Sequence, residues 1–127
     1  MTSYLIVFIG AGIGGALRHA VNVGCARACG IAFPWGTLVV NIVGSTVMGL
    51  LAAWLAFKAG AAWSQATKLF LVTGLLGGFT TFSAFSLDAV LLWERGDFVI
   101  AAAYVAASVV LSIGGLVAGL AALRALV

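Results

Sequence analysis

Long apolar runs alternate with short polar stretches along the whole chain. Four runs reach the length needed to cross a bilayer, about 20 mostly apolar residues, and they cover roughly residues 4–23, 35–57, 69–93 and 98–120. The polar stretches between them are short, and the last is the tight hairpin "ERGD". The pattern predicts an all-α protein with four transmembrane helices, in a single integral membrane domain that covers residues 1–127.

The composition supports a membrane location. Hydrophobic residues make up 65% of the 127 residues and charged residues 7%, and the mean hydropathy is +1.28, whereas a soluble domain is about a quarter charged. The N-terminus lacks a basic region and a small-residue cleavage site, so we interpret the first run as a span and not as a removed signal peptide. Tryptophans lie near the span ends, as expected at the membrane interface: Trp35, Trp54, Trp63 and Trp93.

Basic residues are divided evenly between the two expected sides of the membrane. One side carries Lys58, Lys68 and Arg124, and the other carries Arg18, Arg27 and Arg95. A bias in Lys and Arg normally sets the orientation of a membrane protein, and three against three gives no bias. The count favours insertion in both orientations and an antiparallel homodimer; the alternative is that another factor fixes one orientation. The basic residues form no patch, so nucleic acid is not an expected partner.

Small residues recur at helical spacing in the first two spans. The first contains Gly10 and Gly14 in "GAGIGG", and the second contains Gly44 and Gly49 in "NIVGSTVMG". Small side chains let helix backbones approach closely. The sequence leaves open whether these glycines pack the helices of one chain or form a seam between two chains. Because four helices barely enclose a water-accessible path, a transport function favours more than one subunit.

Two rows of polar residues follow single helix faces inside the spans. Residues four apart share a face, and the rows are Thr37, Asn41 and Ser45 in the second span and Tyr104, Ser108 and Ser112 in the fourth. Isolated Ser and Thr residues often bond to their own backbone. The amide of Asn41 cannot be satisfied in this way, so it needs a partner, a water or a substrate. Intramembrane polar groups of this kind indicate function.

No acidic residue is expected near the middle of a span. Asp88, Glu94 and Asp97 fall toward a span end, and what remains inside is a set of hydrogen-bond donors, which suits an anion. Arg18 lies about two-thirds of the way across the first span, where it either extends to the interface or lines a positively charged vestibule. With one histidine, His19, and no central acid, the chain offers no acid–base pair for an enzyme.

The third span contains the segment "GLLGGFTTFSAFS". Tandem Gly77 and Gly78 weaken a helix by about 1 kcal/mol each relative to Ala, and a broken helix survives at this depth only where its freed backbone meets protein, water or an ion. Phe79, Phe82 and Phe85 follow at every third position. A phenylalanine ring has a positive edge, so rings turned inward can cradle a small anion beside hydroxyl donors; the alternative is that the rings only pack or face lipid.

The motifs "GGALRHAVN", "GTLVVNIVGS" and "GLLGGFTTFSAFSLD" together resemble those of the Fluc family of fluoride channels, the CrcB-type proteins. The resemblance covers essentially all four spans. It implies an antiparallel dual-topology homodimer with two narrow pores built from both subunits and a broken third helix. It also implies passive, selective export of fluoride from the cytoplasm across a bacterial inner membrane.

The resemblance also assigns roles to individual residues. Pore residues are Asn41, Phe82, Phe85, Thr81, Ser83, Tyr104, Ser108 and Ser112, to which we add Thr37 because it shares a face with Asn41. The carbonyls of Gly77 and Thr80, from both subunits, are expected to hold a structural sodium ion. Arg18 matches a vestibule arginine of the first span. The residue that follows this arginine is usually aromatic in the family, and here it is His19.

Two other interpretations compete with a fluoride channel. A small dual-topology multidrug exporter should have a membrane-embedded glutamate in its first span, and this chain has none. A non-transporting scaffold explains the glycines but not the polar rows. Cys25 and Cys29 lie four apart and, with His19, could bind a metal, but the small number of ligands favours structural cysteines.

Overall fold

The computed structural model describes residues 1–59 and 63–126, and these residues form helices joined by short loops. The helices are α1 (Thr2–Cys29), α2 (Trp35–Trp54), η1 (Leu55–Ala59), α3 (Gln65–Lys68), η3 (Leu69–Leu76), α4 (Gly77–Phe79), α5 (Phe82–Glu94) and α6 (Phe98–Leu126). Segments η1 and η3 are π-helical. Part of the expected second connector, residues 60–62, lies outside the described residues.

Four helical segments are long and apolar enough to cross a membrane, which confirms the predicted number of spans. They are Thr2–Cys29, Trp35–Phe57, Gln65–Glu94 and Phe98–Leu126. The first and last continue six residues beyond the predicted ends at 23 and 120, because apolar composition marks what lipid covers and not where helical hydrogen bonding stops. Helix α1 ends only at Gly30, whose φ of 80° is readily available to glycine.

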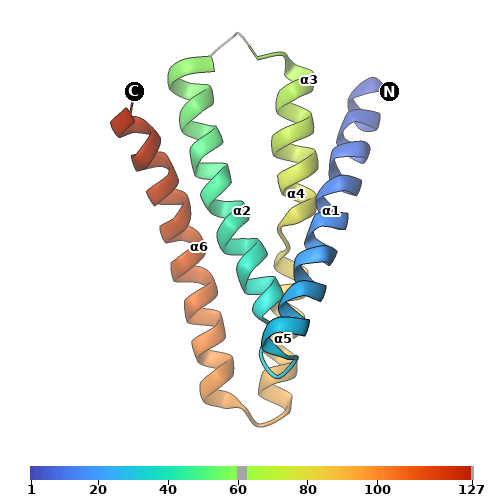
Figure 1. Ribbon diagram of the computed structural model, residues 1–127, viewed down its shortest axis with the longest axis vertical. Coiled ribbons are helices and arrows are strands. Elements are labelled where there is room, and N and C mark those ends of the chain that lie inside the picture. The colour runs from blue at the N-terminus through green and yellow to red at the C-terminus, as the bar shows by residue number, and fades with distance from the viewer. Residues whose placement is uncertain (60–62, 127) are drawn as a thin grey trace.

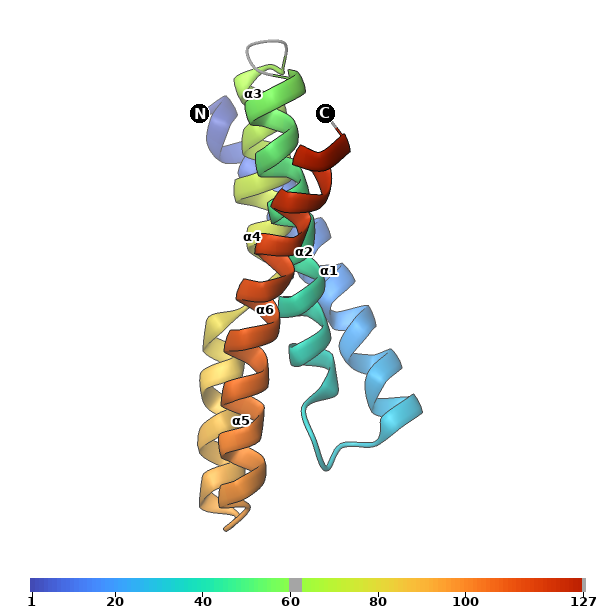
Figure 2. The ribbon, with the colours of Figure 1, turned by 90° about the vertical axis from the view of Figure 1, so that its left-hand side faces the viewer.

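The chain runs up and down through the bundle, as Figure 1 shows. Both termini lie at the same end as α3, and the α1–α2 loop lies at the opposite end with the α5–α6 turn. Helix α2 packs along α6, and α1 packs along η3 and α4. In the view of Figure 2, the α5–α6 pair diverges from the α1–α2 pair toward the end that contains the two short turns.

Glycines bring α1 into backbone contact with η3 and α4, and we call this contact the glycine interface. A Cβ atom added at Gly10 would lie 2.7 Å from the Phe70 carbonyl oxygen, and one at Gly14 would lie 2.8 Å from the Phe79 amide nitrogen. Gly49 similarly meets the backbone of Leu116 in α6. These glycines therefore pack helices of one chain together. The sequence had left open whether they do this or form a seam between two chains.

The third span changes its helical form twice before it is interrupted. It begins as α3 and η3, and the glycine pair Gly77 and Gly78 lies within α4 with helical geometry. Helical geometry stops two residues later, at Thr80 (φ −79°, ψ 160°) and Thr81 (φ −156°, ψ 121°), and α5 resumes at Phe82. The interruption is visible between α4 and α5 in Figure 1. The residues with extended backbone are thus the two threonines and not the glycines that precede them.

Candidate functional site

Asn41 of α2 holds the extended backbone of the third span from the side. Its Nδ2 donates to the Thr81 carbonyl at 3.0 Å, and the Thr81 amide donates to Asn41 Oδ1 at 2.8 Å. The side-chain amide therefore replaces the hydrogen bond that the Thr81 N–H would make in a continuous helix, and it adds a second donor to the Thr81 carbonyl, which is the N-cap carbonyl of α5. This is the partner that the sequence required for Asn41, and it is supplied by a residue 40 positions away.

The interruption leaves particular carbonyls without their helical donors. In a continuous helix the Thr81 amide donates to the Gly77 carbonyl, but here it donates to Asn41. Likewise the Ala84 amide, which would return to Thr80, donates to the Thr81 hydroxyl at 3.1 Å. The carbonyls of Gly77 and Thr80 are the two that the family resemblance assigns to sodium. Oxygen ligands of this type suit a hard cation, so the residues fit the ion.

A cavity of about 280 Å³ opens beside the interruption, and we call it the polar cavity. It is lined by Asn41, Ser45, Thr80, Thr81, Phe82, Phe85, Ser108, Val109, Ser112 and Ile113. These residues come from α2, from the extended segment and from α5 and α6. None of the lining side chains carries a charge. The cavity therefore combines hydroxyl and amide groups with aromatic rings.

Two hydroxyls in the wall of the polar cavity have no hydrogen-bond partner among the described residues. Ser108 Oγ and Ser112 Oγ are both buried and have no partner at ordinary hydrogen-bond distance in the described part of the chain, and the Ser108 hydroxyl lies near that of Tyr104. Because an unsatisfied buried hydroxyl costs about 1–3 kcal/mol, two of them four residues apart on one helix face indicate a ligand or ordered water. A hydroxyl can donate or accept, so this row can serve an anion.

Aromatic rings continue from the wall of the polar cavity into the protein. The rings of Phe82 and Phe85 are 5.5 Å apart, and those of Phe85 and Tyr104 are 5.4 Å apart. Tyr104 is fully buried, and its hydroxyl donates to Asp88 Oδ2 at 3.1 Å. Phe82 is 78% exposed. One side of the aromatic wall is thus covered by this chain, and the other side is open.

The structure gathers most of the predicted pore residues, but not all of them. Thr37 is buried outside the cavity wall, Tyr104 lies behind Phe85, and Ser83 is 3.3 Å from the Thr81 hydroxyl without lining the cavity. Ser45 also lines the cavity, although it is not among the predicted pore residues. Its position four residues after Asn41, in the same polar row, could have identified it. Thr80, expected only as a sodium ligand, also lines the cavity. The hydrogen bond between Tyr104 and Asp88 could not be predicted from any spacing or motif in the sequence.

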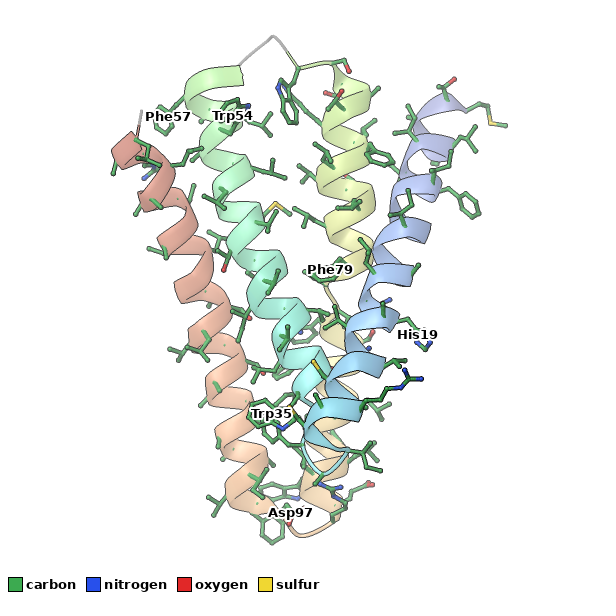
Figure 3. The ribbon with its side chains drawn as sticks, in the orientation of Figure 1. His19, Trp35, Trp54, Phe57, Phe79 and Asp97 are labelled. Carbon is green, nitrogen blue, oxygen red and sulfur yellow. The ribbon has the colours of Figure 1, made fainter. Side chains whose placement is uncertain are left out.

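The remaining candidates on α1 lie away from the polar cavity. Arg18 is half-buried and does not line the cavity, and Figure 3 shows His19 pointing outward from α1. Cys25 and Cys29 are free thiols. Within residues 1–59 and 63–126, no group of three or more His, Cys, Asp or Glu side chains could hold a metal ion.

Comparison with known proteins identifies the family. The sequence model for "CrcB-like protein, Camphor Resistance (CrcB)" matches residues 5–120. The chain is 57% identical over 122 residues to fluoride-specific ion channel FluC 2 of Nitrobacter hamburgensis, covering 96% of this chain and 97% of the relative. It is 56% identical over 124 residues to a fluoride-specific ion channel FluC of Rhodopseudomonas palustris, covering 98% of each chain.

A third relative spans the whole sequence. It is a fluoride-specific ion channel FluC of Granulibacter bethesdensis, 54% identical over 127 residues and covering 100% of this chain and 98% of the relative. Such identity over nearly full length, together with four membrane-capable helices, leaves one conclusion. The chain belongs to the CrcB family and is a multi-pass bacterial membrane protein.

Proposed function

We propose that this protein is a fluoride channel that conducts the ion passively out of the cytoplasm. The observation that carries the proposal is the polar cavity, an uncharged chamber with two unpaired serine hydroxyls and an aromatic wall. The names of the relatives, which are fluoride-specific ion channels, supply the ion. The ion passes along Ser108 and Ser112 on one side and along Phe82 and Phe85 on the other.

The chemistry of the cavity suits a small, strongly hydrated anion. Fluoride must exchange its water for closely spaced donors, and hydroxyl groups with ring edges provide them. No lining residue supplies a fixed positive charge that would hold the ion, and conduction requires sites weak enough for the ion to leave. The row of hydroxyls on α6 therefore acts as a series of weak sites. Arg18, outside this row, raises the local anion concentration from a vestibule.

The proposal includes an antiparallel homodimer with two pores. Phe82 leaves 78% of its surface uncovered although it lines the cavity, so a second chain is needed to close the pathway. The balance of basic residues, three against three, favours two opposite orientations. A tag at the C-terminus should be accessible from both sides of the membrane. Accessibility from a single side would contradict this arrangement.

A structural sodium ion at the centre of the dimer forms part of the proposal. The carbonyls of Gly77 and Thr80 are available because Asn41 and the Thr81 hydroxyl take the amides that would otherwise bond to them. A sodium ion bound there would supply positive charge that offsets the partial negative charge of these carbonyl oxygens. Asn41 and the Thr81 hydroxyl keep these two carbonyls free of helical donors, and two chains together provide the ligand number that one chain lacks.

A multidrug exporter is not favoured, because the first span contains no acidic residue and the relatives carry the name of a fluoride channel. The proposal is tested by reconstituting the purified protein in liposomes loaded with fluoride or with chloride. We expect rapid passive release of fluoride and retention of chloride. Release of both ions, or of neither, would contradict the proposal.

A further inference from the structure

The aromatic wall extends beyond the polar cavity to a residue in the α1–α2 loop. The ring of Phe33 packs at right angles to Tyr104, with 5.4 Å between their centres, and its other neighbour is Trp35 at 4.6 Å. Together with Phe85, Phe33 confines the fully buried Tyr104 ring between aromatic neighbours. A continuous chain of rings therefore runs from the start of α2 to Phe82 in the cavity wall.

Phe33 lies in a segment without regular secondary structure, so its position needs an anchor. Arg95, in the turn between α5 and α6, supplies one: its Nη2 donates to the Ala32 carbonyl at 2.8 Å across 63 residues of sequence. The same nitrogen is 3.2 Å from Asp97 Oδ2. Figure 3 shows Trp35 and Asp97 at the same end of the bundle. The loop that contains Phe33 is thus tied to the α5–α6 turn.

We propose that Phe33 is a positioning residue for the fluoride pathway, and that Arg95 holds it in place. This inference rests on the proposed function. Tyr104 begins the hydroxyl row that continues through Ser108 and Ser112, and its hydroxyl, which donates to Asp88 Oδ2, fixes the start of that row behind the cavity wall. Packing against Phe33 and Phe85, together with the hydrogen bond to Asp88, holds the Tyr104 ring in place. Without Phe33 the ring gains other rotamers, and the hydroxyl leaves the row.

A double-mutant cycle in reconstituted protein tests this role. In the wild-type background we expect Phe33→Leu to lower fluoride flux roughly tenfold, the effect of misplacing one charge-assisted hydrogen bond. In a Tyr104→Phe background, which has no hydroxyl to misplace, the same change should alter flux by less than about twofold. An equal loss in both backgrounds would overturn the inference, as would full flux in the single variant.

Variants of Arg95 provide a second test if Phe33→Leu does not fold, because the Arg95 side chain is half exposed and tolerates substitution more easily. Arg95→Gln should lower flux roughly threefold, and Arg95→Lys, which keeps a donor for Ala32, should restore most of it. Asp97→Asn is the matched control, because it removes the ion pair and leaves the bond to Ala32. Unchanged flux in Arg95→Gln would contradict the anchor. Wild-type protein that passes no fluoride would overturn the proposed function and this inference together, whereas conducting wild-type protein with fully active variants would overturn only the inference.

Discussion

The glycine interface and the polar cavity lie in the same bundle but are built by opposite means. At the glycine interface, α1 meets η3 and α4 through backbone contacts, and there is no room for even one added carbon at Gly10 or Gly14. At the polar cavity, α2, α5 and α6 leave about 280 Å³ open and two hydroxyls unpaired. One region is packed as closely as backbones allow, and the other stays open.

The difference indicates that the glycine interface stabilises the bundle, whereas the polar cavity serves the proposed function. Close backbone packing stabilises helices in lipid, where water does not drive apolar surfaces together. An open cavity with unsatisfied hydroxyls lowers stability, and it persists because the neighbouring helices are held elsewhere. Asn41 joins the two regions, because it fixes the extended segment that follows α4 and also lines the cavity.

The largest effect is expected at this junction. Asn41→Leu removes both hydrogen bonds to Thr81 and leaves the Thr81 N–H without a partner, at a cost of about 1–3 kcal/mol. We expect a much lower melting temperature in detergent and loss of fluoride flux. Thr46→Val is the matched control on the same helix, because the Thr46 hydroxyl donates to the Ile42 carbonyl of its own helix at 2.8 Å. Equal melting temperatures for the two variants would show that Asn41 does not join the regions.

A smaller effect, confined to stability, is expected at the glycine interface, where two glycine substitutions should shift the free energy of unfolding in opposite directions. Gly14→Ala places a methyl group against the backbone of Leu75 and Phe79 and should destabilise the protein by about 1–3 kcal/mol. Gly12→Ala, on the same helix with open space around it, should stabilise it by up to about 1 kcal/mol. Thermal unfolding of both variants measures the difference. The comparison fails if they shift in the same direction, or if Gly14→Ala alters the flux of the folded protein.

The smallest effect is expected for the stability of the polar cavity itself. Ser112→Ala removes a buried hydroxyl that has no partner within the described residues, so the free energy of unfolding should stay constant or rise by up to about 1 kcal/mol. Ser86→Ala, whose hydroxyl bonds to the Phe82 carbonyl, is the control and should change stability by no more than about 0.5 kcal/mol. A clear destabilisation by Ser112→Ala would mean that the hydroxyl has a structural partner.

Hydropathy and spacing predicted much of this arrangement. The four spans follow from apolar length, and the rows that include Asn41 and Ser108 follow from a four-residue period. The exact interruption did not follow, because glycine pairs only weaken a helix locally, while the extended residues are selected by Asn41, 40 positions away. The bond from Tyr104 to Asp88 and the packing of Phe33 also depend on tertiary contacts, which no local pattern records.

The central claim is that the unpaired hydroxyls of the polar cavity form the path of the ion. The most direct measurement compares fluoride efflux from liposomes containing wild-type protein with efflux through the Ser108→Ala, Ser112→Ala double variant, with the melting temperature of each preparation. We predict that flux falls roughly tenfold or more, as expected for lost hydrogen bonds to an ion, while the melting temperature does not fall. Wild-type flux through the folded double variant would contradict the claim.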